Sequence, residues 1–567
     1  MGFALGYVQS EDYGDQVAVG LVKQRGTYAR YVGRDSIDDD FAARADHQRA
    51  VETFYLLDRA TRDVYEGFAE GLNFYIRLHR DEFPSWIQPD FTAIDAHAAD
   101  IQSWSRADAA RFARDEARRH GDAATDGNGT QPQPTDHASA ALPRSWTAAL
   151  REEATFDATR DGSNAWALHG SRTTSGNPIL LRNPHLAWTA GYYEAHVRVP
   201  GIIDFYGDFR IGGAFGIIGG FNEHLGWATT NNSPRYSQVY ALERHPRLTD
   251  HALLDGAPLP IVQRTIAVDY TEPDGTSGVE TEVTPWTPYG PVIYETDEHI
   301  YVLKDPRDGE FRRGEQFLRM MAATDLAEWE SIMRTRAHPS SNFTYADADG
   351  NIVLYYNARI PSLPHAPTGD TAAVARSGRD MWTELAPWES LPFYLNPPGG
   401  YVQQANDTPD YINLNVPLDR DTVPANLPEP RLRLRSQLSF ALIHNDRVLS
   451  LEDVIELKHS PRMLAAERML DDLLAAVDAT DGAEGLAAAR GVLGAWDRTA
   501  AAASRGGVLF TRWYEAYQEV ADTTVFRESW DPQRPASTPV GVGSPGKAVV
   551  ALRFAVEDME KEGLPLD

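Results

Sequence analysis

The stretch Asp161-Gly162-Ser163-Asn164-Ala165-Trp166-Ala167-Leu168 joins a polar tract, rich in proline and glycine, to an apolar run typical of a β-strand. A Gly-Ser bond at such a junction is typical of a serine that lies inside a precursor and is exposed by peptide cleavage. A serine at a new N-terminus carries its own base, because its free α-amine can accept the proton of its hydroxyl. Most Gly-Ser dipeptides are ordinary turns, so the residues that follow must decide.

The next residues predict two strands that return on each other. Ser175-Gly176-Asn177-Pro178 has the composition of a turn, and Ile179-Leu180-Leu181 that of a short buried strand. Such a hairpin would bring His185 back beside Ser163. A single histidine is more often structural than catalytic, but His185 follows Pro184 at the end of a strand, where the polar groups of functional sites tend to lie.

Six segments, in the same order, resemble blocks of the penicillin acylase family of N-terminal-nucleophile hydrolases. A single block of this kind is a weak signal, whereas six in register are a strong one. The α-chain details at Arg25–Gly33 resemble most the branch of acyl-homoserine-lactone and aculeacin acylases. The six blocks are Gly6–Asp12, Gly162–Trp188, Tyr192–Gly201, Gly220–Asn231, Ser341–Ile352 and Gly400–Pro409.

The resemblance implies four catalytic residues and a processing site. Ser163 would be the nucleophile, and the precursor would be cut between Gly162 and Ser163. The backbone N–H of Asn231 and the side-chain amide of Asn342 would hold the oxyanion. His185 stands where the family has either His or Gln, and it would position the α-amine and assist the cut.

The resemblance also indicates substrate-binding residues and bears on metals. Leu186 and Trp188 are expected either to line the acyl pocket or to be plain core residues. The acidic residues that bind calcium in penicillin G acylase itself have no match after Asn231, where Asn232-Ser233-Pro234-Arg235 stands. No required metal and no cofactor are therefore predicted.

An α+β fold is predicted, and the resemblance sharpens it to the four-layer αββα sandwich of this superfamily. Residues 1–118 carry helical periodicity and form the α-chain-like region, and residues 119–162, which are poor in apolar side chains, form the predicted spacer peptide. Residues 163–567 form the β-chain-like region, in which strands dominate up to about Leu303 and helices return at Ser450, predicted to form a capping box with Asp453. Both ends fall short of the family's usual limits, so we expect a chain truncated at both ends, with the C-terminal part of the β-chain region missing.

Composition restricts the partners and the location. The formal net charge of −29 argues against nucleic acid or an anionic membrane as partner. The absence of cysteine excludes disulfides and thiolate nucleophiles. The sequence contains no signal peptide and no apolar run of about 18 residues that could span a bilayer. The resemblance implies a periplasmic or extracellular protein, whereas a genuine start at Met1 would indicate the cytoplasm.

Two hypotheses about function follow. The first is an autoprocessed amidohydrolase, whose α and β chains arise from one precursor and form a heterodimer. It would cleave the amide bond of a small N-acyl compound, such as an acyl-homoserine lactone, a lipopeptide or a β-lactam side chain. The second is an inactive truncated paralogue that binds ligands or partners without turnover. Every proposed catalytic position holds a workable residue type, which favours the first hypothesis.

Overall fold

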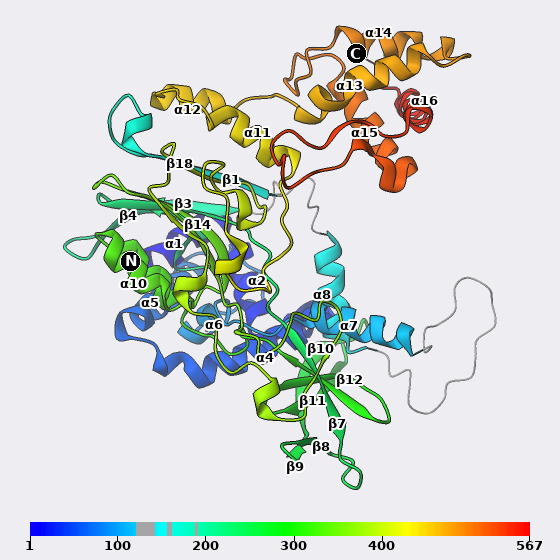
Figure 1. Ribbon diagram of the computed structural model, residues 1–567. Coiled ribbons are helices and arrows are strands. Elements are labelled where there is room, and N and C mark those ends of the chain that lie inside the picture. The colour runs from blue at the N-terminus through cyan, green and yellow to red at the C-terminus, as the bar shows by residue number, and fades with distance from the viewer. Residues whose placement is uncertain (121–141, 156–161, 187–190, 567) are drawn as a thin grey trace. The chain divides into compact units, whose positions relative to one another are not determined.

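The computed structural model of the chain describes residues 1–120, 142–155, 162–186 and 191–566 (Figure 1). Contacts within the chain divide it into two compact units, numbered 1 and 2 here. All residues proposed for catalysis belong to unit 1. Unit 1 comprises Met1–Ala167, Leu180–Asn396 and Leu418–Pro428, and unit 2 comprises Leu168–Ile179, Pro397–Pro417 and Glu429–Asp567.

Helices make up the first part of unit 1, as the periodicity of its sequence predicts. In α5 (Arg59–Leu78), Val64, Phe68 and Leu72 share one buried face, because residues four apart lie on the same side of a helix. The neighbouring α1 packs closely through a glycine: a Cβ on Gly6 would lie 2.1 Å from the carbonyl oxygen of Phe68. The other helices of unit 1 are α1 (Gly2–Tyr13), α2 (Asp15–Gln24), α3 (Ala29–Val32), α4 (Ile37–Thr53), α6 (Ala93–Ala98), α7 (Arg106–Arg119), α8 (Arg144–Thr155), α9 (Arg313–Ala322) and α10 (Leu326–Met333).

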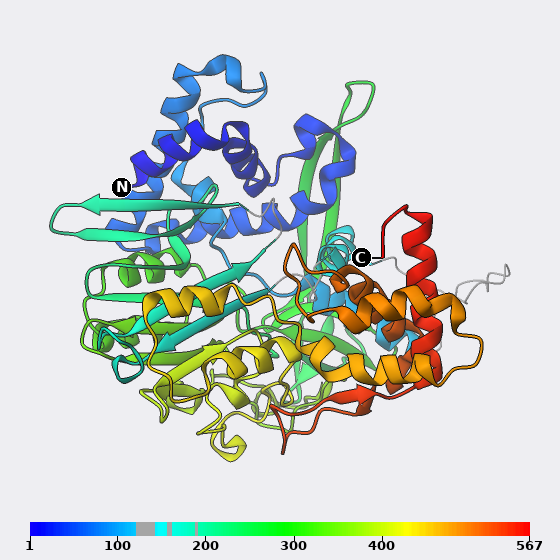
Figure 2. The same ribbon diagram turned by 90° about the horizontal axis from the view of Figure 1, so that it is seen from above.

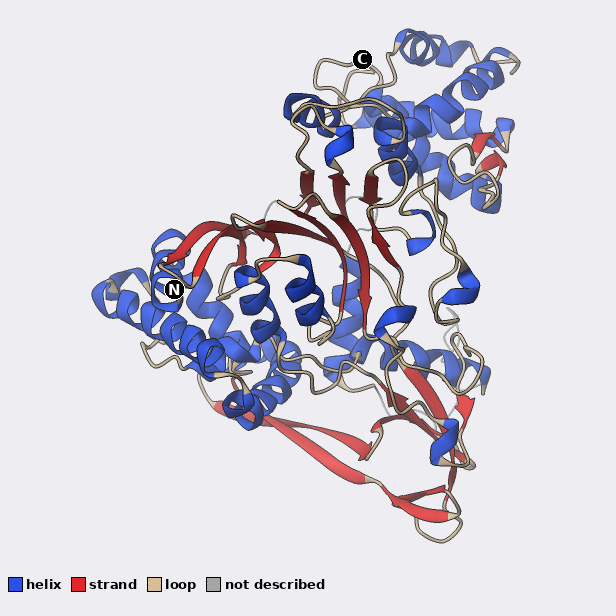
Figure 3. Cartoon of the chain, turned by 60° about the vertical axis from the view of Figure 1, so that its left-hand side comes forward, coloured by secondary structure: helices blue, strands red, loops and turns tan. Residues whose placement is uncertain are grey.

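The centre of unit 1 is a seven-stranded antiparallel sheet in the order β17-β15-β14-β6-β5-β4-β3. Helices cover one face of this sheet (Figure 3), where the ring of Trp329 lies 6.1 Å from that of Phe343 and 5.0 Å from that of Tyr345. Every residue of β15 is buried, as expected of a strand covered on both faces. The strands are β3 (Tyr192–Val199), β4 (Ile203–Arg210), β5 (Gly216–Phe221), β6 (Leu225–Thr230), β14 (Ser340–Asp347), β15 (Ile352–Ala358) and β17 (Phe393–Leu395).

The opposite face of the seven-stranded sheet is covered by the neighbouring strands β1 (Gly162–Leu168) and β2 (Ile179–His185). They approach closely because a glycine lies beneath them: a Cβ on Gly226 of β6 would lie 3.2 Å from Cδ2 of Leu180. Side chains alternate between the two faces of a strand, so Thr230 and its cross-strand partner Asn342 point to this same face. The fold therefore places the strands of Ser163 and His185 over the face that carries Asn342.

A second sheet of unit 1 has the order β10-β11-β12-β13-β7-β8-β9, with β16 beside β7. The strands β10 and β11 form a long antiparallel ribbon (Figure 1), in which Val262 faces Trp286 and Thr271 faces Ser277. The polar–apolar alternation of residues 263–270 correctly predicts β10. The strands are β7 (Gln238–Arg244), β8 (His251–Leu254), β9 (Ala257–Pro260), β10 (Val262–Thr271), β11 (Ser277–Thr287), β12 (Gly290–Glu295), β13 (His299–Lys304) and β16 (Ala373–Val374).

Unit 2 is mainly helical, and its last helices share a core of their own (Figure 2, orange and red). Trp513 is fully buried in this core and donates a hydrogen bond from Nε1 to the carbonyl oxygen of Ala548, at 3.0 Å. The capping box of Ser450 and Asp453 is present, which confirms its prediction. The elements of unit 2 are β18 (Tyr401–Gln404), α11 (Leu434–Ile443), α12 (Leu451–Lys458), α13 (Leu464–Asp478), α14 (Ala487–Ala495), α15 (Gly507–Ala521), β19 (Phe526–Glu528), β20 (Val540–Val542) and α16 (Pro545–Lys561).

The predicted spacer, residues 119–162, is only partly described. Its helix α8 packs into unit 1: Trp146 is buried against the ring of Trp104, and Ser145 Oγ donates a hydrogen bond to Glu282 at 2.6 Å. Residues 121–141 and 156–161 of the spacer lie outside the described residues. The prediction of an α+β fold is confirmed, whereas the limits of the spacer stay predictions.

Candidate active site

Ser163 is the second residue of β1 and is only 7% exposed. The apolar residues that follow it, from Ala165 to Leu168, are all buried and anchor the strand in the core. The anchored strand holds Ser163 in place.

His185 ends β2, the strand next to β1. Its Nε2 lies 3.5 Å from Nδ2 of Asn164 and 3.1 Å from Nδ2 of Asn183. Amide nitrogens are donors, so Nε2 of His185 is placed to accept from both side chains. The hairpin thus brings His185 against the residue next to Ser163, close to where the sequence predicts it.

Asn342 lies on β14 and is fully buried. Its Nδ2 donates to Oγ1 of Thr230 at 3.1 Å and to the carbonyl oxygen of Asn231 at 3.3 Å. Its Oδ1 is buried without a hydrogen-bond partner among the described residues. The two proposed oxyanion residues are therefore adjacent, and the Asn342 amide nitrogen donates to two protein acceptors, Thr230 and Asn231.

A further chain of hydrogen bonds supports the loop that carries Asn231. Asn232 donates from Nδ2 to the carbonyl oxygen of Asn357 at 2.9 Å, and Asn357 donates from Nδ2 to that of His338 at 2.8 Å. His338 in turn lies 2.8 Å from Oγ of Ser341, the residue before Asn342. Burial lowers the pKa of His338 well below its usual value, so this ring is neutral.

Sequence reasoning missed four polar residues that support the site. They lie within or near the quoted blocks, but nothing in a single sequence distinguishes them from ordinary strand residues. One feature of the sequence could have indicated Thr230. Side chains alternate between the two faces of a strand, and this alternation places Thr230 on the same face of the sheet as its cross-strand partner Asn342. The missed residues are Asn164, Asn183, Thr230 and Asn357.

The remaining site predictions are not tested by the structure. Leu186 is 38% exposed, and Trp188 lies outside the described residues, so their role in an acyl pocket stays a prediction. Within the described part of the chain, no group of three or more His, Asp or Glu residues is placed to hold a metal ion. None of the helices that the structure describes is long and apolar enough to cross a membrane.

Comparison with known proteins adds an independent observation. The sequence model of the penicillin amidase family matches residues 1–567. The chain belongs to this family. The resemblance of the six sequence blocks to penicillin acylases is thereby confirmed.

Similar members of the penicillin amidase family include three acylases. Over 97% of its length, the chain is 25% identical to the acyl-homoserine lactone acylase PvdQ of Pseudomonas fluorescens and covers 74% of it. It is 27% identical to the aculeacin-A acylase of Actinoplanes utahensis, over 92% of this chain and 73% of that protein. A shorter match, 27% identical over 45% of this chain and 34% of the relative, is to the penicillin acylase 2 proenzyme of a Pseudomonas species.

The thermostable penicillin G acylase of Alcaligenes faecalis is a solved structure similar to this chain. The match has a TM-score of 0.52 and 20% sequence identity, and covers 71% of this chain and 80% of that one. At this identity the likeness concerns the fold. The predicted sandwich fold of the N-terminal-nucleophile hydrolases is confirmed.

Proposed function

We propose that this protein is an autoprocessed amidohydrolase that cleaves the amide bond of an N-acyl compound. The observation that carries the proposal is a family match over the whole chain, combined with Ser163 at the start of a buried strand. The names of the relatives supply the substrate class: an acyl-homoserine lactone, a lipopeptide such as aculeacin A, or a β-lactam side chain.

Maturation would begin with an attack of Ser163 Oγ on the carbonyl carbon of Gly162. The peptide nitrogen leaves as the α-amine of Ser163, and the preceding chain becomes an ester on its hydroxyl. Water hydrolyses that ester, which frees a carboxylate on Gly162 and the hydroxyl on Ser163. His185 would position the amine as it forms, since its ring contacts Asn164, the next residue along β1.

Turnover would reuse the same hydroxyl. Ser163 Oγ attacks the substrate's amide carbon while the α-amine, which titrates near about 8, accepts the proton. The N–H of Asn231 and the amide of Asn342 would hold the oxyanion, and the leaving amine takes the proton as the carbon–nitrogen bond breaks. Water then hydrolyses the acyl-ester and restores Ser163. The mature protein would be a heterodimer of the two chains.

The test compares Ser163→Ala with Ser175→Ala, a control at an exposed serine in the predicted turn. Purified wild-type protein and the control should show two chains on a denaturing gel, the larger with Ser163 at its N-terminus, and should hydrolyse N-acyl amides. Ser163→Ala should remain one uncut, inactive chain. Cleavage of Ser163→Ala at the same bond would contradict the proposal. A wild-type chain that stays whole and does not turn over N-acyl amides would instead support the inactive paralogue.

The acyl group is a separate question that the same protein can answer. A mass-spectrometric screen of the mature enzyme against acyl amides of graded chain length would measure the preference. We also propose an exported location, periplasmic or extracellular, on the strength of the resemblance alone. Fractionation of the source cells tests it, and the protein in the cytoplasmic fraction would contradict it.

A further inference from the structure

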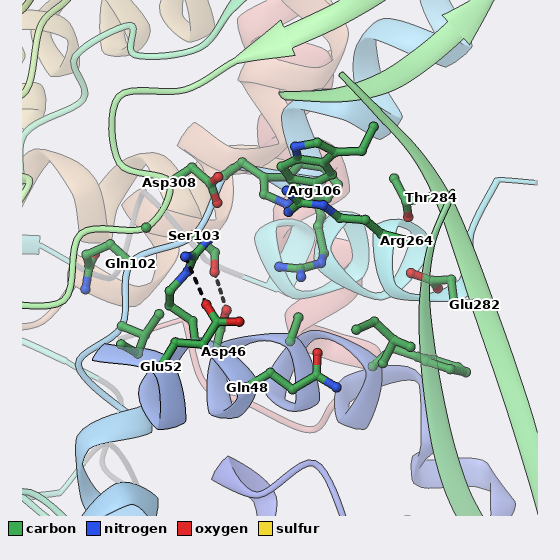
Figure 4. A pocket seen from close by; sticks show the side chains of 18 of the residues that line it. Asp46, Gln48, Glu52, Gln102, Ser103, Arg106, Arg264, Glu282, Thr284 and Asp308 are labelled. Atoms are coloured by element: carbon green, nitrogen blue, oxygen red, sulfur yellow. Dashed lines mark hydrogen bonds and ion pairs between the residues drawn. The ribbon is translucent and has the colours of Figure 1, made fainter. Parts of the chain in front are cut away.

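A cavity of about 490 Å³ lies in unit 1, away from the proposed catalytic residues. Its walls come from α4, the segment that leads into α7, the β10–β11 ribbon and the turn at Asp308 (Figure 4). This volume is within the range of small-molecule sites. The cavity is strongly polar, so its charged side chains decide what it could bind.

Some of these charged side chains already have partners. Arg49 pairs with Glu52 of the same helix, Nη1 to Oε2, at 3.1 Å. Glu282 accepts hydrogen bonds from the backbone nitrogen and Oγ of Ser145, at 3.0 and 2.6 Å. These groups are satisfied within the protein and need no ligand.

Arg106 and Arg264 differ from the other charged residues of the cavity. Neither guanidinium makes a hydrogen bond or ion pair with any residue that the structure describes; each lies instead over an indole ring. Arg106 lies 5.0 Å from the centre of the Trp104 ring, and Arg264 lies 3.8 Å from that of Trp286. The two indoles are in edge-to-face contact at 6.1 Å, so both guanidinium groups rest on one aromatic wall.

We propose that this cavity binds a small organic anion whose phosphoryl or carboxylate head group lies between Arg106 and Arg264. The position of each guanidinium over an indole ring leaves its N–H groups available, and a planar donor fork matches both kinds of oxyanion. The head group would occupy only a small part of the cavity, which leaves room for an organic body. The site is independent of the proposed acylase chemistry.

Two carboxyl groups with raised pKa values, Asp46 and Asp308, line the cavity. Burial raises the pKa of Asp46 to about 6, and burial also raises the pKa of Asp308. Asp46 accepts a hydrogen bond from Ser103 (Figure 4). Protonation of Asp46 as the pH falls through about 6 removes one negative charge that opposes an anion. Glu52 stays paired with Arg49, and Glu282 keeps its charge, since its partners on Ser145 are neutral. Binding should therefore tighten as the pH falls from 7.5 to 5.

The test is equilibrium dialysis of the full chain with labelled sulfate, which stays a dianion across this pH range. Wild-type protein should bind one sulfate per chain below about 10 mM, and the double variant Arg106→Gln/Arg264→Gln should bind at least about tenfold more weakly. Arg247→Gln, which removes a charge from an exposed arginine outside the cavity, should bind like wild type. Asp46→Asn should tighten binding at pH 7.5 and weaken its dependence on pH.

Phenyl phosphate and benzoate, used as competitors of labelled sulfate, identify the head group. The compound that competes more tightly shows whether the site prefers a phosphoryl or a carboxylate head group. Because the cavity has room for an organic group, both compounds should compete better than inorganic phosphate. Wild-type protein that binds none of these anions would overturn the proposal. So would a double variant that binds them as well as wild type does, because a merely structural pair of arginines predicts that result; circular dichroism checks that the double variant is folded.

Discussion

At the scale of single residues, the side-chain amide of Asn342 is one of the two groups proposed to hold the oxyanion. Asn342 is fully buried, and its one amide group joins the end of β6 to β14. We expect Asn342→Ala to lower kcat for an N-acyl amide by roughly 10²- to 10³-fold, the usual effect of removing one oxyanion donor. Thr230→Val, which removes one acceptor of the amide and keeps the amide itself, should lower kcat less than Asn342→Ala does. A kcat for Asn342→Ala within a few-fold of wild type would exclude Asn342 from the oxyanion site.

The candidate site could be predicted from the sequence only through residue types in recognisable blocks. The hairpin prediction placed His185 beside the strand of Ser163, and the structure agrees, since β1 and β2 are neighbours. The sequence could not reveal that Asn342 donates to Asn231. That contact depends on the pairing of β6 with β14, two strands more than a hundred residues apart in the chain, and no local pattern encodes such a register.

At the scale of elements, Asp95 connects three helices. It is buried in the capping box of α6 and accepts hydrogen bonds from Arg25 at the end of α2, at 2.7 and 2.8 Å. It also lies 3.1 Å from the ring of His47 on α4. Although burial opposes ionisation, these hydrogen bonds hold the pKa of Asp95 at about 2, below its ordinary value of 3.8. The carboxylate thus stabilises the folded state.

The lowered pKa of Asp95 determines how the stability of the folded state changes with pH. A folded-state pKa below the unfolded value gives stability that is present above about pH 4 and lost as the pH falls toward 2. We expect Asp95→Asn to lower the free energy of unfolding at pH 7. The difference in free energy of unfolding between wild type and variant should shrink by on the order of 2–3 kcal/mol near pH 2. Urea denaturation at several pH values measures it. Asp90→Asn, at the exposed partner of Arg25, is the control; a gap that does not depend on pH would contradict the assignment.

Element types could be predicted from the sequence more readily than their arrangement. Periodicity gave the helices of the first hundred residues and the strand β10, because each buries one face at a regular spacing. It did not give α8, which lies inside the predicted spacer, because the polar tract before it dominates the composition there. The packing of Trp146 beside Trp104 depends on contacts from another helix, which local composition does not record.

At the scale of the whole molecule, the helical core of unit 2 is separate from that of unit 1. We expect Trp513→Ala to remove about 3–5 kcal/mol from the local stability of this core, because it leaves a large cavity and removes the hydrogen bond from the indole to the carbonyl oxygen of Ala548. Hydrogen exchange measured by mass spectrometry should then speed up in α13, α15 and α16 and stay unchanged in the seven-stranded sheet. Val508→Ala, at a 59% exposed position, is the control. Equal acceleration in both units would contradict two separate cores.

The main core of unit 1 has a kinetic consequence for the proposed maturation. It is built from side chains on both sides of Gly162-Ser163, with Phe68 and Leu72 before that bond and Phe205, Trp227 and Phe343 after it. Once the bond is cut, neither polypeptide alone can complete this core, so recovery from denaturant becomes a reaction between two molecules. Refolding of the uncut Ser163→Ala chain should be independent of dilution, whereas the yield of the mature enzyme should fall as it is diluted. Maturation would then make folding effectively irreversible. The precursor folds once, as a single polypeptide, and the two cleaved chains do not readily refold after they have been denatured.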